Sequence, residues 1–442
     1  MCSMITEVKI TALRAMGIPT AYDYIVNWAN SNSSHFWYHI EDDKYRKEKY
    51  KIDNLQRPKD IQHLITGASY DIVPLQDSLP KNVIQYYNRT IAKVYRKSFA
   101  LTKDMHSFSE NSGEIPYNLR GSHISDVTSK YLNCVNISYS IINDNKYKDG
   151  IYCLACFDNK NWTIQCLGKL SWNQQIVKFN NIGKNIVYLP VLYKDGVSNA
   201  IGMPFLLNNE GNLKELSPSK EKQEITLNMK YPFRSTISLW LSFMKGGIFK
   251  VANKDDFSDS TRIYKIDKIP FYQNTIKINS VSKKYRYFIY DYSSAHCYIN
   301  RFDIGDIIFY DSDGKIIKGS VIGNSGSYNH EPSKVFDLDP LTYFEDNQND
   351  SKKFVAIKTK PTRLSKIKFI GRNDGNNIIP GDKYELYLWN GKWKLIGKAI
   401  ANADGEIVFK NVQKNALLFL KNSKGGAENR IFTYQNGKQL FW

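Results

Sequence analysis

No run of apolar residues in this sequence approaches the ~20 residues that a membrane-spanning helix requires, so the sequence predicts no membrane span. Alanine is scarce outside the first helix-like stretch, whereas tyrosine and phenylalanine number 30 and 22. Aromatic residues favour strands over helices. With 42% apolar residues among 442, the chain can form several cores, and we expect three or four domains that are mainly β.

The sequence also lacks a block of basic residues, although its formal net charge is +18. Its lysines are scattered through the expected strands and turns, which is typical of solvated faces, so we expect no nucleic-acid partner. Six cysteines do not indicate a disulfide framework in so long a chain. Cys153 and Cys156 form a C-x-x-C pattern, but residues three apart on one strand point to opposite faces. We expect both to be core residues.

The first forty residues place a cysteine, a helix and a histidine in an order that suits thiol chemistry. After Cys2, apolar residues recur at helical spacing as far as Met16. Strands are expected over 20–28 and 35–40, and His35 opens the second of them. A helix N-terminus favours thiolate over thiol, and a histidine can take or return the proton. Cys2 is the predicted nucleophile and His35 the predicted general base and acid.

A third residue should hold the imidazole of His35 in the correct tautomer. The charged stretch from Glu41 to Lys49 is typical of a hairpin tip, after which the return strand would lie beside His35. Asp53 is the predicted third member, with Asn54 as the alternative. Trp37 shares a strand face with His35 and would form a wall of the site.

From about position 115 the sequence changes to short alternating strands with Asn, Asp and Gly turns, a pattern that predicts β-sandwiches. We expect a first sandwich over 115–216, a β-rich unit over 217–325 and a final unit over 326–442 that folds by itself. Residues 1–75 would form a partial core and residues 76–114 a linking segment.

The segment ALRAMGIPTAYDYIVNWANSNSSHFWYHI resembles the transglutaminase-like superfamily, in which a Cys-started helix ends in LR-x-x-GIP and a later strand carries His-x-Trp. The resemblance covers about the first sixty residues. It implies an α+β papain-like core in which Cys2, His35 and Asp53 perform acyl transfer or amide hydrolysis on a protein or glycopeptide substrate, with no cofactor required for catalysis.

The nucleophile at position 2 leaves no room for the segment that normally packs behind the catalytic helix. The alternatives are a misassigned start or a decayed copy, and of the three we expect a fragment of a longer protein. Its activity would be doubtful, and Ile5, Val8 and Ala12 would be partly uncovered.

The last two units resemble the discoidin family of galactose-binding-like jelly rolls. In the unit over 217–325, the phrases RYFIYDY and INRFDIGDIIFYDSDGK resemble the closing strands of such a domain. In the unit over 326–442, the phrases KVFDLDPLTYF, KKFVAIKTKPTRLSKIKFIGRND and YELYLWNGKWKLIGK resemble, in this order, its opening half. Members of that family commonly bind glycans or lipid head groups at loops on one rim, so a glycan is an expected ligand. The resemblance also implies a structural Ca²⁺, and carboxylates and carbonyls on a tight loop are the oxygen ligands that this ion prefers. The expected contributors are Asp337, Asp339 and Thr342. The alternative is that the aspartates cap a turn.

A polar loop follows one of the expected strands of this unit. It contains Arg372, Asn373 and Asp374, and the residues could face a glycan or form a simple solvated turn.

The whole arrangement of core, β-sandwich and discoidin-like tail resembles secreted or surface proteins of gut Bacteroides-type bacteria. It implies a secreted, periplasmic or cell-surface location. The alternative function is a non-catalytic glycan-binding or surface interaction protein, in which the N-terminal core serves only as a scaffold.

Overall fold

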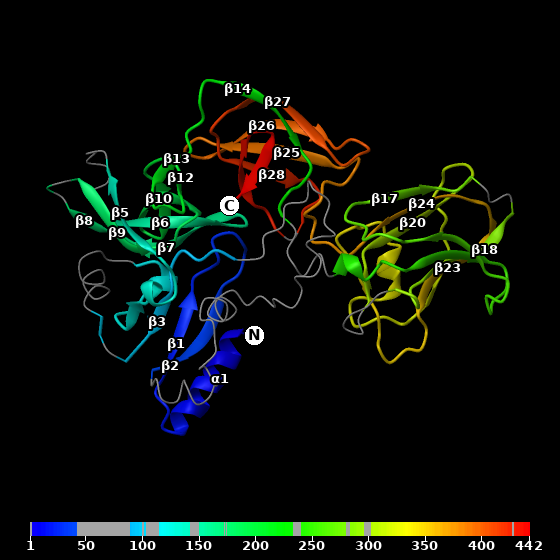
Figure 1. Ribbon diagram of the computed structural model, residues 1–442, viewed down its shortest axis with the longest axis horizontal. Helices are drawn as coiled ribbons and strands as arrows, with labels where there is room; N and C mark the ends of the chain where they lie inside the picture. The colour runs from blue at the N-terminus through cyan, green and yellow to red at the C-terminus, as the bar shows by residue number, and fades with distance from the viewer. Residues whose placement is uncertain are drawn as a thin grey trace.

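The computed structural model shows a mainly β protein with several antiparallel sheets (Figure 1). Among the residues that the structure describes, strands hold 47% and helices 8%, which confirms the predicted fold class at this level and is consistent with several β-sandwich modules. The structure describes residues 2–41, 89–99, 101–102, 115–141, 150–171, 173, 175–232, 240–279, 283–295, 302–426 and 428–442. Among these residues, no helix is long and apolar enough to cross a membrane.

A helix and a four-stranded sheet form the N-terminal unit, with the strand order β2-β1-β3-β4. The elements are α1 (Cys2–Ala15), β1 (Thr20–Ile25), β2 (His35–Ile40), β3 (Tyr95–Lys97) and β4 (Ile124–Asp126). Helix α1 ends because Gly17 adopts a φ of 75° and returns its N–H to the Arg14 carbonyl at 2.9 Å. The predicted helix and the second strand are confirmed, and the first strand ends three residues earlier than expected.

Several apolar residues of α1 stay exposed. The helix face that packs on the sheet is therefore narrower than the helical spacing of apolar residues predicts. Thr6, Ile10 and Leu13 are buried, at intervals of four and three residues. Ile5 and Val8 remain 50% and 70% exposed, as predicted. Thr6 can be buried because its hydroxyl donates a hydrogen bond to the sheet.

The predicted module over 115–216 contains a β-sandwich. One sheet has the order β13-β12-β10-β6-β7, with β11 also paired to β10, and the other has the order β5-β9-β8. The strands are β5 (Val135–Ser140), β6 (Ile151–Asp158), β7 (Asn161–Leu167), β8 (Lys169–Ser171), β9 (Ile176–Ile182), β10 (Ile186–Lys194), β11 (Val197–Ala200), β12 (Phe205–Leu207) and β13 (Leu213–Glu215). Cys153 and Cys156 are buried in β6 and belong to different hydrophobic clusters, which confirms that they point to opposite faces.

A second sandwich packs a five-stranded sheet, β16-β15-β18-β23-β21, against a three-stranded sheet, β17-β24-β20. Its strands are β15 (Ile248–Ala252), β16 (Thr261–Lys265), β17 (Asn274–Lys277), β18 (Tyr285–Asp291), β20 (Asp306–Asp311), β21 (Ser320–Gly323), β23 (Phe354–Thr362) and β24 (Leu364–Ile370), with the short pair β19 (Asp303–Ile304) and β22 (Phe344–Glu345). We call this module, residues 240–370, the middle sandwich. In its core, the ring of Phe249 lies 6.2 Å from that of Phe309 and 5.2 Å from that of Phe369.

The last sandwich combines the sheet β26-β25-β28-β29-β30 with the pair β14-β27. Its strands are β14 (Lys222–Leu227), β25 (Lys383–Trp389), β26 (Trp393–Ile400), β27 (Ile407–Gln413), β28 (Leu418–Asn422), β29 (Ile431–Gln435) and β30 (Lys438–Phe441). Because β14 precedes the middle sandwich in the chain, the middle sandwich is inserted into the last one. The two connections run side by side, with Met229 bridged to Asn377.

These pairings correct the predicted boundaries of the tail. The boundary between 217–325 and 326–442 falls inside the middle sandwich, because β18 pairs with β23 and β20 pairs with β24 across it. Residues 326–442 therefore do not form one separate unit. Alternation along a strand predicts which residues are buried but not which distant strand is the partner.

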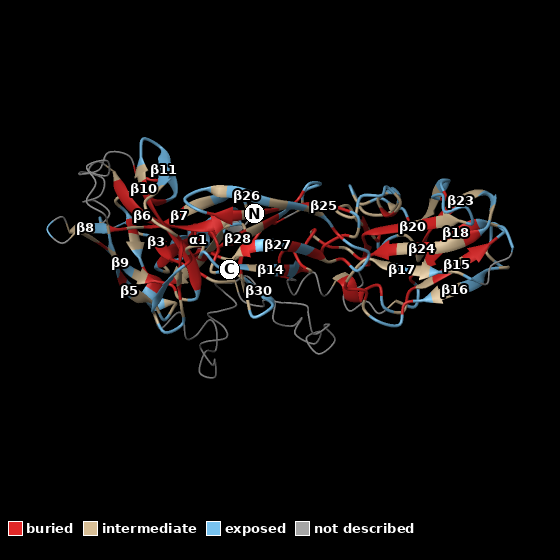
Figure 2. Cartoon of the chain, turned by 90° about the horizontal axis from the view of Figure 1, so that it is seen from above, coloured by how far each residue is buried: buried red, intermediate tan, exposed pale blue. Residues whose placement is uncertain are grey.

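The last sandwich also packs on the N-terminal half of the chain. Trp389, Leu417 and Ile431 share one hydrophobic cluster with Tyr24 and Phe157. Figure 2 shows buried residues along central strands such as β6 and β10, whereas outer strands such as β11 and β26 are more exposed. The N-terminal unit is thus covered by a module that is almost four hundred residues away in the sequence.

Candidate functional site

Cys2 and His35 lie at the same end of the helix and sheet layer. Arg14, near the end of α1, donates to the carbonyl of Thr20, at the start of β1, at 2.9 and 2.7 Å, so β1 runs back along the helix. The 14 residues of α1 span about 21 Å and the six of β1 about 20 Å. Ile25, at the far end of β1, pairs with His35. The start of α1 therefore lies near the start of β2.

One hydrogen bond supports this placement. The hydroxyl of Thr6, one helical turn after Cys2, donates to the carbonyl of Phe36 at 3.2 Å. Phe36 directly follows His35, so the first turn of α1 contacts the backbone at the predicted base.

The ring of His35 nevertheless faces away from the helix. It is stacked between Trp28, at 5.4 Å, and Trp37, at 5.6 Å, on the sheet face that also carries Ile25. Helix α1 packs on the other face, where Ile10 joins a separate hydrophobic cluster. Trp37 shares the face of His35, as the strand alternation predicted.

The predicted contact between the Cys2 sulfur and His35 lies outside the description, because the side chain of Cys2 is not among the described side chains. Strand β2 is the outer strand of its sheet, so a sulfur at the start of α1 can reach His35 only around that edge. The direct contact stays a prediction.

A buried ion pair is linked by hydrogen bonds to a side chain that stacks on His35. Both oxygens of Asp23, in β1, accept hydrogen bonds from the guanidinium of Arg96 at 2.7 Å. Tyr131 donates its hydroxyl proton to Asp23, and the indole of Trp37 donates to the Tyr131 oxygen at 3.2 Å. Burial, and then the nearby Asp23, raise the pKa of Tyr131. A chain of contacts thus runs from Asp23 through Tyr131 and Trp37 to His35.

Sequence reasoning missed this network. The available signal was an aspartate inside the strand TAYDYI, which is buried throughout, because a carboxylate in such a strand needs a cationic partner. The predicted third member, Asp53, and its alternative, Asn54, lie outside the described residues. Asp23 reaches His35 only through other side chains, so it does not take their place.

Asp337, Asp339 and Thr342 do come together, but they bond to one another and to the loop. Asp337 accepts the N–H of Asp339 at 3.0 Å, and Asp339 accepts the N–H of Leu341 at 2.9 Å. The Thr342 hydroxyl contacts the Asp337 carboxylate at 2.9 Å. The oxygens expected for Ca²⁺ are therefore engaged in turn capping, as in the alternative that the sequence left open. Within the described ranges, no cluster of three or more His, Cys, Asp or Glu residues is arranged to hold a metal ion.

A further carboxyl beneath this loop could not be foreseen from the sequence. Asp306, at the start of β20, is only 5% exposed, and its Oδ1 has no hydrogen-bond partner among the described residues. Burial, followed by the charge of Asp337, raises the pKa of Asp306 to about 7. The surroundings of Asp306 therefore favour the protonated acid more than those of an exposed aspartate do.

The loop with Arg372, Asn373 and Asp374 is turned toward the protein. The Arg372 guanidinium lies between the rings of Trp240 and Tyr343, at 3.7 and 3.6 Å, and pairs with Asp303 at 2.9 Å. The Asn373 amide donates to two backbone carbonyls at 3.0 Å. The carbonyl of Asp374 accepts the hydroxyl of Tyr231 at 2.7 Å. These contacts hold the middle sandwich against the two segments that connect it to the last sandwich. The role of this loop in glycan binding stays a prediction.

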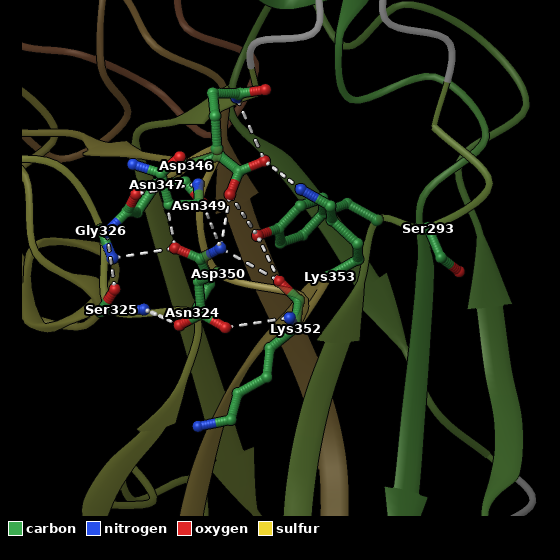
Figure 3. Close-up of polar contacts among 12 residues, drawn as sticks. Ser293, Asn324, Ser325, Gly326, Asp346, Asn347, Asn349, Asp350, Lys352 and Lys353 are labelled. Carbon is green, nitrogen blue, oxygen red and sulfur yellow. Dashed lines mark hydrogen bonds and ion pairs between the residues drawn. The ribbon is translucent and has the colours of Figure 1, made fainter.

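The densest polar cluster of the middle sandwich lies at another set of loops (Figure 3). Asn324 is fully buried; its oxygen accepts the N–H of Gly326 at 2.8 Å, and its amide donates to Asp346 and to the Lys352 carbonyl. Burial raises the pKa of Asp346, while Lys353, at 2.9 Å, opposes the rise. Because the side-chain groups of Asn324 are all engaged, this cluster fixes the loops relative to one another.

Comparison with known proteins adds no assignment. No known family matches the sequence, and no curated protein matches it. Among solved structures, a crystal structure of native alpha-2-macroglobulin from Escherichia coli, spanning domains MG0-NIE-MG1, is similar over 70% of this chain and 100% of that chain, at 11% identity and a TM-score of 0.11. A likeness of this size carries no argument about fold or function. Any function proposed for this chain is therefore argued from its own residues.

Proposed function

We propose that this protein performs thiol-dependent acyl transfer or amide hydrolysis on protein or glycopeptide substrates, with Cys2 as the nucleophile and His35 as the general base and acid. The observation that carries the proposal is the shared end of α1 and β2. Cys2 is the first residue of α1, and the pairing of Ile25 with His35 puts the histidine at that same end.

The chemistry follows from these two groups. The partial positive charge at the N-terminus of α1 favours the thiolate of Cys2. The thiolate attacks an amide carbonyl carbon, the C–N bond breaks, and the departing amine or ammonia takes a proton from the His35 imidazolium. Water or an acceptor amine then gives a proton to His35 and attacks the thioester. Hydrolysis or transfer results, and the thiolate is regenerated.

The aromatic residues around His35 give the ring a fixed plane. Trp28 and Trp37 hold it at interplanar angles of 22° and 28°, and the guanidinium of Arg89 lies over the ring of Trp28, 3.8 Å from its centroid. In this proposal Asp53 orients the second ring nitrogen. The Asp23–Tyr131 network holds Trp37 in place and so maintains the stack.

A second function is favoured by the direction of the His35 ring. Because the ring faces away from α1, the N-terminal unit can equally be a scaffold in a non-catalytic glycan-binding or surface interaction protein. In that case Cys2 would be an ordinary thiol, and the β-sandwiches would carry the binding. The two proposals make opposite predictions about the reactivity of one sulfur.

Alkylation of the full chain with iodoacetamide, followed by peptide mass spectrometry, decides between them. Burial raises the pKa of Cys153 and Cys156, and it raises that of Cys166 to about 12, so these thiols are internal controls that should not react. An activated Cys2 should react well below pH ~8.5, the value for a free thiol.

Substitution then tests the assigned roles. His35→Gln should shift the pH dependence of Cys2 alkylation upward, and Asp53→Asn should do so to a smaller extent. If wild-type Cys2 titrates as a free thiol and His35→Gln changes nothing, acyl transfer is refuted and the interaction function stands.

A further inference from the structure

A buried charged loop of the last sandwich enters the N-terminal half of the molecule. The loop joins β28 to β29 and carries Glu428 and Arg430, which are 1% and 0% exposed. Their side chains pair at 3.2 Å. Two ionised groups at this depth are costly to desolvate, and apolar residues of similar volume would often stabilise a protein as well or better. A role in positioning neighbours would explain the pair.

The loop is anchored on the turn between β6 and β7. Arg430 donates to the carbonyl of Phe157 at 3.1 Å. Asn429 donates its backbone N–H to the side chain of Asn159 at 2.8 Å and its amide to the Asn159 carbonyl at 3.1 Å. Around the anchor, Phe157 packs edge-on against Trp393 at 5.7 Å. The loop therefore has a fixed place on the neighbouring module.

From this anchor, Glu428 reaches the segment that precedes His35. Its Oε1 and the carbonyl of Asn32 are the two acceptors of the Ser31 hydroxyl, each at 3.4 Å, and Ser31 is fully buried. Ser31 lies in the connection from β1 to β2, between Trp28, which stacks on His35, and His35 itself. This connection contains Ser33 at a φ of 85°, a conformation that a non-glycine residue keeps only when its surroundings impose it.

We propose that Glu428 and Arg430 are positioning residues for His35, so that the last sandwich completes the N-terminal site instead of acting as a separate binding module. Arg430 fixes the Glu428 carboxylate, the carboxylate holds Ser31, and Ser31 fixes the connection that carries Trp28 and leads into His35. The catalytic role of Glu428 and Arg430 rests on the proposed function. Their effect on the position of His35 is independent of that function.

Three substitutions in the full chain test the path with graded disturbance. Ser31→Ala removes only the hydroxyl, and Glu428→Gln keeps an acceptor but removes the charge. Arg430→Lys keeps the positive charge but loses the planar guanidinium, which bonds both Glu428 and the Phe157 carbonyl. The matched control is Glu221→Gln, which breaks the exposed ion pair with Lys414, 2.9 Å apart, in the same sandwich.

The first readout is the imidazole signal of His35 in carbon-13 histidine-labelled protein, assigned with His35→Gln. We expect Ser31→Ala, Glu428→Gln and Arg430→Lys to move both its chemical shift and its titration midpoint, and Glu221→Gln to move neither. Unchanged His35 signals in Ser31→Ala and Glu428→Gln, with folding verified by circular dichroism, would overturn the proposal.

The second readout is the pH profile of Cys2 alkylation in the same proteins. A shift of one unit in the thiol titration changes the rate below its midpoint about tenfold, and we expect Glu428→Gln to approach that size. If His35 moves but wild-type Cys2 reacts as a free thiol, the positioning stands and the proposed function fails. If Cys2 is activated but none of the three variants alters its profile, the function stands and the positioning fails.

Discussion

Replacing Asp306 by asparagine should stabilise the middle sandwich at pH 8 and leave its stability almost unchanged at pH 4. The Oδ1 of this buried carboxyl has no hydrogen-bond partner within the described part of the chain, and burial, followed by the charge of Asp337, raises the pKa of Asp306 to about 7. In the unfolded chain the same group titrates near ~3.9.

The sign follows from proton binding. Between about pH 4 and pH 7 the folded protein keeps a proton on Asp306 that the unfolded chain has lost. The free energy of unfolding therefore falls as the pH rises, by about 1.36 kcal/mol per unit, or about 4 kcal/mol over the whole window as an upper bound. Asparagine cannot ionise, so Asp306→Asn removes this slope while its amide still offers an acceptor to the loop.

Urea unfolding measured separately for this module is the appropriate assay. Trp240 is the only tryptophan of residues 231–372, so the fluorine NMR signal of 5-fluorotryptophan at that position reports the middle sandwich within the full chain. Asp313→Asn, at an exposed turn after the same strand, controls for the loss of one negative charge.

The quantity to compare is the difference between variant and wild type as a function of pH, since the other carboxyls cancel in it. We expect that difference to grow from pH 4 to pH 7 and then to level off, and to stay flat for the control. A constant difference across the range would show that Asp306 is ionised in the folded protein and refute the reasoning.

Three further predictions concern the fold and its loops. Arg96→Met should destabilise the N-terminal unit by about 3–5 kcal/mol, measured by chemical denaturation, because it leaves the Asp23 carboxylate buried without its cation; a loss below 1 kcal/mol would contradict this. A fragment of residues 231–372 should give the cooperative melting and β-type circular dichroism of a folded sandwich, whereas 326–442 should not, since it lacks β15 to β20. If Asp337 and its neighbours serve only as turn caps, the melting temperature should be the same in Ca²⁺ and in chelator; a clear rise with Ca²⁺ would support the metal site instead.

Local features were the part of the fold that the sequence could predict. The spacing after Cys2 and the break at Gly17 predicted α1, because helix period and a positive-φ glycine are properties of neighbouring residues. The opposite directions of Cys153 and Cys156 followed from strand alternation in the same way. Even here the burial of Thr6 was not predicted, since it depends on a hydrogen bond to the distant Phe36 carbonyl.

Features that depend on distant partners could not be predicted. Asp306 looks like any strand-initiating aspartate until the loop around Asp337 covers it, 31 positions later in the sequence. The predicted domain boundary at 325 was wrong for the same reason. Strand β18 pairs with β23, and the sequence of either strand alone does not indicate its partner. The candidate site shows the same limit: His35 and Trp37 were placed on one face from local alternation, but Glu428 enters from the other end of the chain.

The insertion of the middle sandwich has a consequence for synthesis on the ribosome. Strand β14 ends at Leu227, and its partner β27 begins at Ile407. With about 180 residues between them and an elongation rate of roughly 5–20 residues per second, β14 waits about 9 to 36 s for its partner to be made. The inserted module can be complete by then, so the nascent chain should acquire its interior module before its enclosing one. A slow-translating stretch before residue 407 would lengthen the time during which β14 is open to pairing with another chain.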